Sequence, residues 1–199
     1  MTDELIVEQV LRGNTHVFSE IVNRYKDKVF GMVYRFTNDY AEAQDLSQEV
    51  FITVFKNLHL FGEKAKFSTW LYRVGYNLCI DWTRKNKKRR KEAYVQDECL
   101  EMADEMYNLE DSIINSYKQK AVRKEINSLA EKYKTVIILY HYQGLSYEEI
   151  GEVLKVPVKT VESRLYRSRK LLKKSLEKYR YGGESFEMQS GGEVNGQIS

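Results

Sequence analysis

Apolar side chains recur every three or four residues along most of this chain, a spacing that places them on one face of an α-helix. The longest such pattern covers 17–36 and contains Val17, Phe18, Ile21, Val22, Tyr25, Val29, Met32, Val33 and Phe36. Similar patterns predict helices over about 2–12, 40–58 and 68–91, the last capped by Ser68. No segment alternates apolar and polar residues for long enough to predict a strand. The sequence therefore predicts an all-α fold.

The second half of the chain has the same helical spacing and clearer boundary signals. It predicts helices over about 118–128, 132–142, 147–154 and 158–179. Gly144 stands where the end of a helix favours a left-handed residue. Ser146 and Glu149 have the spacing of a capping box, and Pro157 interrupts the pattern shortly afterwards. We therefore expect a short helix, a tight turn and a longer helix here, which is the order of a helix-turn-helix.

Charge changes the picture because it falls into four blocks, although the formal net charge of the 199 residues is only +3. Residues 1–92 hold 16 basic and 12 acidic side chains, and residues 118–181 hold 16 and 7. Residues 93–117 hold seven acids and no base, and residues 182–199 hold three acids and no base. The prediction is two small helical domains at 1–92 and 118–180, an acidic flexible linker at 93–117 and a disordered tail at 181–199.

The predicted helix after Pro157 combines an apolar stripe with a cationic outer face. Residues 155–180 contain ten basic and two acidic side chains. Such a helix suits the major groove of duplex DNA, which admits an α-helix and displays a distinct pattern of donors and acceptors for each base pair. The ordinary alternative is a solvated basic helix in a bundle. The outer face carries Lys159, Glu162, Ser163, Arg164, Tyr166, Arg167, Lys170, Lys173 and Lys174.

The segment from Phe67 to Lys91 interleaves aromatic and polar side chains before a basic run. Seven of the eight residues at 84–91 are basic. Aromatic faces stack on unpaired bases and cations follow the backbone, so this composition suits single-stranded nucleic acid. The alternative is that the tryptophans are core residues and the basic run is a solvated helix end. A stripe through Leu71, Leu78 and Trp82 would suffice as core, which predicts greater exposure for Tyr72, Arg73, Tyr76 and Asn77.

Asp45, Gln48 and Glu49 share one face of the predicted helix at 40–58. A pair of carboxylates could act in catalysis, but no histidine or further acid is placed to complete a metal site. The chain also has no Walker loop, no GxGxxG, no HExxH and no nucleophile elbow. We expect an acidic face that docks on a basic partner, with plain solvation as the alternative. The chain is not predicted to be an enzyme, and no cofactor or metal is expected.

Several other classes of protein are disfavoured. The longest apolar run, from Val136 to Tyr140, is far shorter than the ~20 residues that span a bilayer. The first residues include Asp3 and Glu4, where a signal peptide would be basic. Two cysteines, Cys79 and Cys99, cannot form a disulfide framework. The expected compartment is the cytoplasm.

Three separated motifs resemble the extracytoplasmic-function sigma factors, the smallest members of the bacterial sigma-70 family. The resemblance covers roughly 1–180, with the motifs in the right order and with the right gap. The motifs are Asp45-Leu46-Ser47-Gln48-Glu49; Phe67-Ser68-Thr69-Trp70-Leu71-Tyr72-Arg73 with Asn77 and Asp81; and Leu145-Ser146-Tyr147-Glu148-Glu149-Ile150-Gly151 followed by Val156-Pro157-Val158-Lys159-Thr160-Val161-Glu162-Ser163-Arg164.

The resemblance implies an alternative sigma factor that directs core RNA polymerase to promoters and helps to melt the −10 element. It implies two helical domains, called region 2 and region 4, at 1–92 and 118–180. Asp45, Gln48 and Glu49 would dock on the clamp helices of the polymerase β′ subunit. Region 4 would read the duplex −35 element and bind the β flap. An anti-sigma factor, often membrane-anchored, is a further implied partner.

The resemblance also assigns DNA contacts residue by residue. Glu162 departs from the family pattern, in which a basic residue is common at that place; a carboxylate there repels phosphates but can accept a hydrogen bond from cytosine N4. For the single-stranded −10 element the residues are Phe61, Lys64, Lys66, Trp70, Arg73, Tyr76, Asn77, Arg84 and Lys85. For the −35 element they are Lys159, Thr160, Glu162, Ser163, Arg164, Tyr166, Arg167 and Lys170.

Two other functions compete with this interpretation. A helix-turn-helix regulator that binds duplex DNA without polymerase would account for 118–180, but it would leave the aromatic and basic segment at 67–91 without a role. An enzyme with a nucleic-acid-binding module is disfavoured, because the sequence supplies no nucleophile, no metal cage and no phosphate loop. Binding to an operator in the absence of polymerase distinguishes the regulator from a sigma factor.

Overall fold

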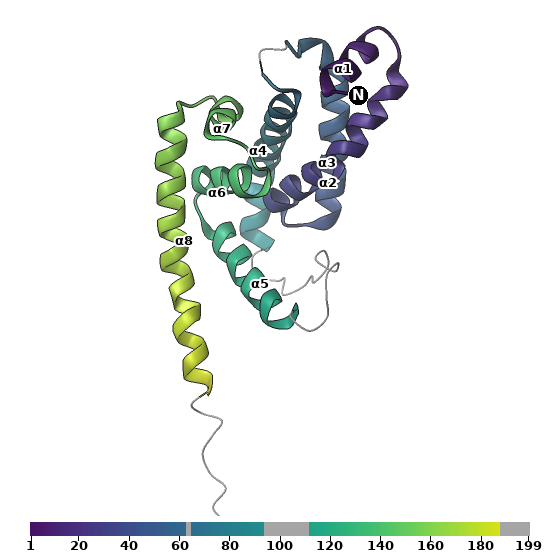
Figure 1. Ribbon diagram of the computed structural model, residues 1–199. Coiled ribbons are helices and arrows are strands. Elements are labelled where there is room, and N and C mark those ends of the chain that lie inside the picture. The colour runs from purple at the N-terminus through teal and green to yellow at the C-terminus, as the bar shows by residue number, and fades with distance from the viewer. Residues whose placement is uncertain (63–64, 94–111, 188–199) are drawn as a thin grey trace, which may run out of the picture. The chain divides into compact units, whose positions relative to one another are not determined.

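The computed structural model describes residues 1–62, 65–93 and 112–187. Within these ranges every regular element is helical and no strand occurs, which confirms the predicted all-α fold. The seven acids counted at 93–117 all lie at 97–111, outside the described residues. The helices are α1 (Asp3–Leu11), α2 (Phe18–Thr37), α3 (Tyr40–Lys56), α4 (Phe67–Ala93), α5 (Ser112–Ser128), α6 (Glu131–Ile137), α7 (Tyr147–Leu154) and α8 (Val158–Glu187) (Figure 1).

The chain divides into two compact units. One comprises Met1–Glu101 and Thr135–Ser163, and the other comprises Met102–Lys134 and Arg164–Ser199. These units do not follow the four charge blocks, so the domain boundaries placed at 92 and 118 stay predictions.

In the first unit, helices α1 to α4 enclose an apolar core. Helices α1, α2 and α3 each bury one stripe, as the three- and four-residue spacing predicts, whereas α4 buries more of its surface near its start. Gly75 allows a close approach between α4 and α2, because a Cβ at this position would lie 2.6 Å from Cε of Met32. The core includes Ile6 and Val10 of α1, Ile21, Val29 and Met32 of α2, Val50 and Val54 of α3, and Leu71 and Cys79 of α4.

The connection between α2 and α3 shows how local sequence sets a helix boundary. Asn38 adopts the left-handed conformation that ends α2, and the Asp39 carboxylate then accepts a hydrogen bond from the Glu42 backbone N–H at 2.8 Å. The Glu42 side chain does not return a capping bond to Asp39. Its carboxylate accepts instead from the indole Nε1 of Trp82 at 2.9 Å, which ties the start of α3 to α4.

Three helix boundaries differ from the sequence expectation. Helix α4 begins at Phe67, so Ser68 lies inside its first turn instead of capping it, because the fully buried Phe67 ring draws the helix start into the core. Helix α5 begins at Ser112, within the predicted linker, since no proline or glycine interrupts 112–128. Helix α8 continues to Glu187, beyond the predicted end near 179; the two glycines at 182–183 weaken a helix by about 1 kcal/mol each but do not stop it. The predicted disorder of the tail stays a prediction.

The helix-turn-helix predicted from sequence is present. Helix α6 continues directly into a π-helical turn over Ile138–Tyr142, and Gly144 follows with a φ of 68°. Between α7 and α8 the chain turns at Lys155, whose φ is 53°. Gly151 permits this turn, because a Cβ there would lie 3.0 Å from the Val156 carbonyl oxygen. Val161 near the start of α8 is buried, as are Ile150 and Val153 of α7.

The capping box at the start of α7 is complete, and its removal is our first prediction. Ser146 Oγ accepts from the Glu149 N–H at 3.2 Å, and Glu149 accepts from the Ser146 N–H at 2.8 Å. Ser146→Ala is expected to lower the free energy of unfolding by about 1 kcal/mol, measured by urea denaturation. Ser163→Ala is the control, because the Ser163 hydroxyl donates to the Thr160 carbonyl within α8 and caps no helix. Its loss should change the free energy of unfolding by under about 0.5 kcal/mol. Equal losses in both variants would contradict the capping role.

In the second unit, α8 is held by a buried hydroxyl as well as by apolar packing. Ser168 is fully buried and donates to the Arg164 carbonyl within α8 at 2.6 Å and, at 3.2 Å, to the carbonyl of Tyr133 in α6. Leu165 and Ile126 are buried in the same unit. These contacts direct the opposite side of α8 towards solvent.

Candidate polymerase and nucleic-acid interfaces

The outer side of α3 presents two carboxylates and an amide together. Asp45, Gln48 and Glu49 are all exposed, because the neighbouring Leu46 and Val50 turn into the core. One helical turn further on, Ile52 and Phe55 are also exposed, at 53% and 40%. Phe55 contacts Phe18 edge-on, with 5.1 Å between ring centroids. The sequence analysis did not single out these two apolar residues, although their position off the buried stripe would have identified them.

Phe61 and Trp70 are not exposed stacking platforms. They are 9% and 7% exposed, and their ring centroids lie 5.6 Å apart. Phe67, which is fully buried, packs against both, with centroid distances of 5.5 Å and 5.8 Å. Tyr72, which was expected on the exposed side, is only 2% exposed, and burial raises its pKa to about 12. The core of this unit is therefore wider around the start of α4 than a single stripe predicts.

A cavity of about 320 Å³ lies beside the rings of Phe61 and Trp70. One of its walls is Thr69, whose hydroxyl is buried and has no hydrogen-bond partner within the described residues. Thr69 was not among the predicted contacts, because a single threonine in a helical pattern gives no signal of its own. The lining residues are Leu60, Phe61, Gly62, Ala65, Thr69, Trp70, Arg73 and Glu152.

The other predicted −10 residues are spread along α4 and the loop before it. Arg73 and Tyr76 are half-buried, and Asn77 is exposed. Arg84 and Lys85 are exposed, with Arg84 lying 3.6 Å from the Asp81 carboxylate. Lys64 lies outside the described residues.

Lys66 forms an ion pair with Glu149 in the same compact unit. Its ammonium donates to Glu149 Oε1 at 2.9 Å, and this hydrogen bond raises the pKa of Lys66. Burial alone would raise the pKa of Glu149, but the hydrogen bonds from Ser146 and Lys66 lower it overall. Glu149 therefore serves both the α7 capping box and this ion pair.

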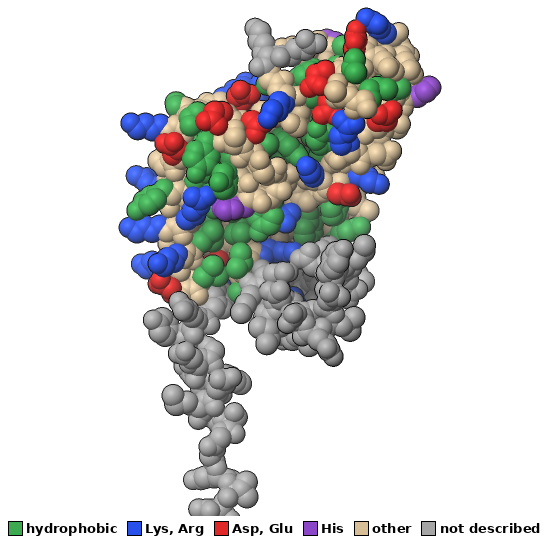
Figure 2. Space-filling view, in the orientation of Figure 1, with side chains coloured by type: hydrophobic (Ala, Val, Ile, Leu, Met, Phe, Trp, Pro, Cys, Tyr) green, Lys and Arg blue, Asp and Glu red, His purple; other side chains and the backbone are tan. Residues whose placement is uncertain are grey.

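The outer face of α8 is cationic, as the sequence predicts. Lys159, Glu162, Ser163, Arg167 and Lys170 are exposed, Thr160 and Arg164 are half-buried, and Tyr166 is 69% exposed. Figure 2 shows Lys and Arg side chains following α8. A hydrogen bond from Arg167 lowers the pKa of the Tyr133 hydroxyl, which links this face to α6.

The described ranges, 1–62, 65–93 and 112–187, contain neither a candidate metal cluster nor a candidate membrane span. In these parts of the chain no three His, Cys, Asp or Glu side chains gather in a way that could hold a metal ion. Over the same residues, no helix combines the length and the apolar character needed to cross a membrane.

Comparison with known proteins decides the family. The family models described as Sigma-70 region 2 and Sigma-70, region 4 match residues 21–89 and 119–172. The chain is 37% identical over 179 residues to the ECF RNA polymerase sigma factor SigW of Bacillus subtilis, covering 85% of this chain and 94% of SigW. The chain belongs to the extracytoplasmic-function sigma factors. The RNA polymerase sigma-H factor of Pseudomonas aeruginosa is 33% identical over 181 residues, covering 88% of this sigma factor and 94% of that one.

Solved structures agree on the fold of this sigma factor. CnrH, solved in complex with the cytosolic domain of CnrY, matches with a TM-score of 0.66 and 24% identity, covering 88% of this chain and 97% of that one. RpoE of Bartonella quintana, solved with the anti-sigma factor NepR, matches with a TM-score of 0.65 and 20% identity. The match covers 80% of this chain and 96% of that one.

Membership of this family establishes the biochemical role. The protein is an alternative sigma factor that works with core RNA polymerase and promoter DNA in transcription initiation, and it is not itself an enzyme. A helix-turn-helix regulator acting without polymerase is less supported, because the first half of the chain also matches a sigma region.

Proposed function

We propose that this sigma factor uses three surfaces. The exposed face of α3 with Asp45, Gln48 and Glu49 docks on the β′ clamp helices, the loop before α4 with α4 itself reads the −10 element, and the outer face of α8 reads the −35 element. The observation that carries the proposal is the separation of charge: an exposed acidic face on α3 and an exposed basic face on α8. A basic protein surface suits the first, and the phosphate backbone suits the second.

The cavity beside Phe61 and Trp70 supports the role in opening the −10 element. Extruding a base from duplex DNA costs a few kcal/mol, and stacking a base on an aromatic side chain returns ~1–3 kcal/mol. One or two captured bases therefore roughly balance the cost. Contacts with polymerase and with the charged DNA backbone then make opening of the −10 element favourable. Because both rings are buried, they act as cavity walls and not as exposed stacking platforms.

The face of α8 supports the role at the −35 element. Duplex DNA is bound largely through phosphates, while sequence is read by a few side chains that reach base edges. Lys159, Arg167 and Lys170 supply charge, and Ser163, Arg164 and Tyr166 lie where a recognition helix meets the groove. Thr160, which is half-buried, borders this face. Binding of region 4 to the polymerase β flap is part of the same proposal.

An anti-sigma factor, often membrane-anchored in this family, is the proposed regulator, and the cytoplasm is the proposed compartment. RpoE of Bartonella quintana is bound to the anti-sigma factor NepR in its solved complex. The sigma factor is expected to act in a stress response, as the family resemblance implies.

Run-off transcription tests the proposal. The purified chain is added to bacterial core RNA polymerase on a promoter library, and new start sites are sequenced. We expect discrete starts that share two upstream elements. Asn77→Ala and Arg164→Ala should reduce these starts at least about tenfold, while Lys26→Ala on the exposed side of α2 leaves them unchanged. Starts that share no upstream element, or equal effects of all three variants, would overturn the assignment of the surfaces.

Glu162 is expected to determine base preference more than affinity. Its carboxylate is exposed on the DNA face of α8, where it repels phosphates but can accept from cytosine N4. Glu162→Ala should change the preference at one position of the −35 element by about 1–3 kcal/mol. Competition between duplexes for the holoenzyme measures the preference. Glu177→Ala, further along α8, is the control. An unchanged −35 preference in Glu162→Ala would refute this role.

A further inference from the structure

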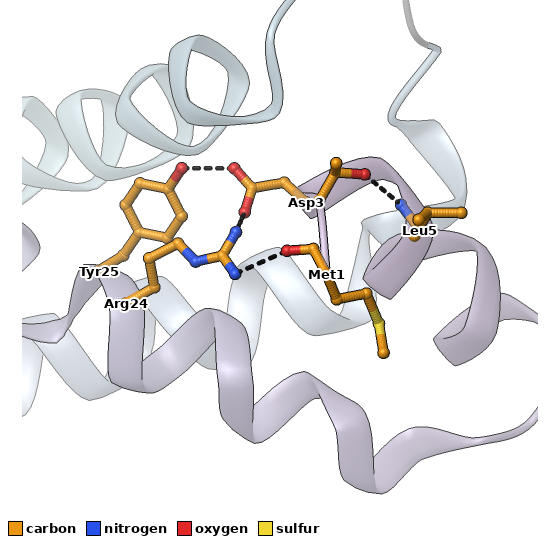
Figure 3. Close-up of polar contacts among 6 residues, drawn as sticks. Met1, Asp3, Leu5, Arg24 and Tyr25 are labelled. Carbon is orange, nitrogen blue, oxygen red and sulfur yellow. Dashed lines mark hydrogen bonds and ion pairs between the residues drawn. The ribbon is translucent and has the colours of Figure 1, made fainter.

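The start of α1 is fastened to α2 by a compact polar cluster. The Asp3 side chain is 15% exposed and uses both of its carboxylate oxygens: one pairs with the Arg24 guanidinium and the other accepts from the Tyr25 hydroxyl at 2.5 Å. Arg24 also donates to the Met1 carbonyl at 2.9 Å. Figure 3 shows the tyrosine hydroxyl and the guanidinium converging on this carboxylate. The hydroxyl therefore holds the Tyr25 ring at a set angle.

The Tyr25 hydroxyl stays a donor at all ordinary pH values. The residue is 8% exposed, and its pKa is raised, first by burial and then by the hydrogen bond and the negative charge of Asp3. A buried hydroxyl needs a partner, and a bond to a carboxylate is among the stronger hydrogen bonds available.

The Tyr25 ring begins a continuous path of packed aromatic rings. Its centroid lies 6.1 Å from that of Phe67 and 6.4 Å from that of Tyr72. Phe67 in turn contacts Phe61 and Trp70, which line the cavity described above. Close-packed interiors transmit small displacements, because their side chains have few alternative arrangements.

We propose that Asp3 and Tyr25 are positioning residues for −10 recognition, acting through the ring of Phe67 on the cavity walls Phe61 and Trp70. This inference rests on the proposed role of that cavity. Neither Asp3 nor Tyr25 lines the cavity, so their effect is on the angle and place of its walls. Tyr25→Phe keeps the ring and removes only the bond that orients it.

The test is base preference, which a merely structural role does not alter. The full chain is assembled with core polymerase, and its affinity is measured for single-stranded oligonucleotides that carry the −10 element found by run-off sequencing, with each base replaced in turn. A lower folded fraction reduces affinity for every oligonucleotide by the same factor, so it cancels in the ratio of affinities. We expect Tyr25→Phe to lower the preference ratio about fivefold to tenfold.

Three further variants make the result specific. Thr2→Ala is the matched control. The Thr2 side chain caps α1 by accepting from the Leu5 N–H, so the substitution removes this cap and leaves the Tyr25 hydrogen bond in place. It should lower stability and leave the ratio unchanged. Asp3→Asn retains an oxygen that accepts from Tyr25, so it should keep the ratio within about twofold of the parent. Phe67→Leu should lower the ratio as Tyr25→Phe does, and the double variant should fall no further.

The possible failures are distinguishable. A parent holoenzyme without preference among the oligonucleotides overturns the proposed role of the cavity, and this inference with it. A clear parental preference that Tyr25→Phe retains overturns the positioning role alone. Losses that add up in the Tyr25→Phe, Phe67→Leu double variant overturn the path through Phe67.

Discussion

Reversing the charge on α3 with Asp45→Lys and Glu49→Lys is expected to weaken binding to core RNA polymerase by about 2–5 kcal/mol. Both carboxylates are exposed on one side of the helix, so the substitutions should leave the fold intact. Against a basic docking surface they replace attraction with repulsion, and like charges brought together at an interface cost several kcal/mol. The exposed Ile52 and Phe55 extend the same face, and they supply the apolar area that a docking surface also needs.

The measurement is competition of unlabelled variants against a fluorescent copy of the sigma factor for core polymerase. Glu20→Lys is the matched control, because it reverses an exposed carboxylate on α2 and leaves the α3 face unchanged. We expect the control to compete as the parent does. The docking assignment would be wrong if the double variant on α3 also competed as well as the parent.

Truncating Trp70 to alanine is expected to lower the free energy of unfolding by about 3–5 kcal/mol. The side chain is 7% exposed and packs against Phe61 and Phe67, so its removal leaves a hole in the core as well as losing buried apolar area. The loss is a large fraction of the roughly 5–15 kcal/mol that stabilises a typical domain, so we expect a clearly smaller folded fraction on warming than in the parent. Promoter opening should fail in the same variant, because a wall of the cavity has been removed.

Urea denaturation measures the stability change. Tyr166→Ala provides the aromatic control, since that ring is 69% exposed on α8 and its truncation should change stability by under about 0.5 kcal/mol. Trp70→Phe separates the two roles of the residue, because it keeps an aromatic wall and restores most of the packing. A Trp70→Ala protein as stable as the parent would show that the ring is dispensable to the core.

Local sequence patterns predicted the helices and several of their ends because those features depend on neighbours along the chain. The stripe from Phe18 to Phe36 became the buried side of α2. Ser146 caps the helix that it was expected to cap, since a cap involves only the next three residues. The predicted end of α8 near 179 was wrong because glycine weakens a helix without terminating it.

The assignment of buried and exposed aromatic rings could not be made in the same way. Tyr72 was expected on the exposed side of α4, Trp70 was left between a stacking and a core role, and the resemblance made Phe61 a −10 contact, yet the structure buries all three. Their burial depends on Tyr25 and Phe67, which approach from another helix and from the start of α4. A helical stripe reveals the middle of the buried face but not its width, which is set by how many neighbours pack around the helix.

By itself the sequence determined the all-α class, the helix-turn-helix with its capping box, the acidic face of α3 and the basic face of α8, because period, caps and charge are local properties. Only the tertiary structure decided that Phe61 and Trp70 are walls of a cavity, that Glu42 bonds to Trp82 and that Asp3 holds Tyr25. The Glu42–Trp82 and Asp3–Tyr25 contacts join residues 40 and 22 positions apart. The order of residues does not encode which distant side chains meet, because that depends on how four helices pack into one core.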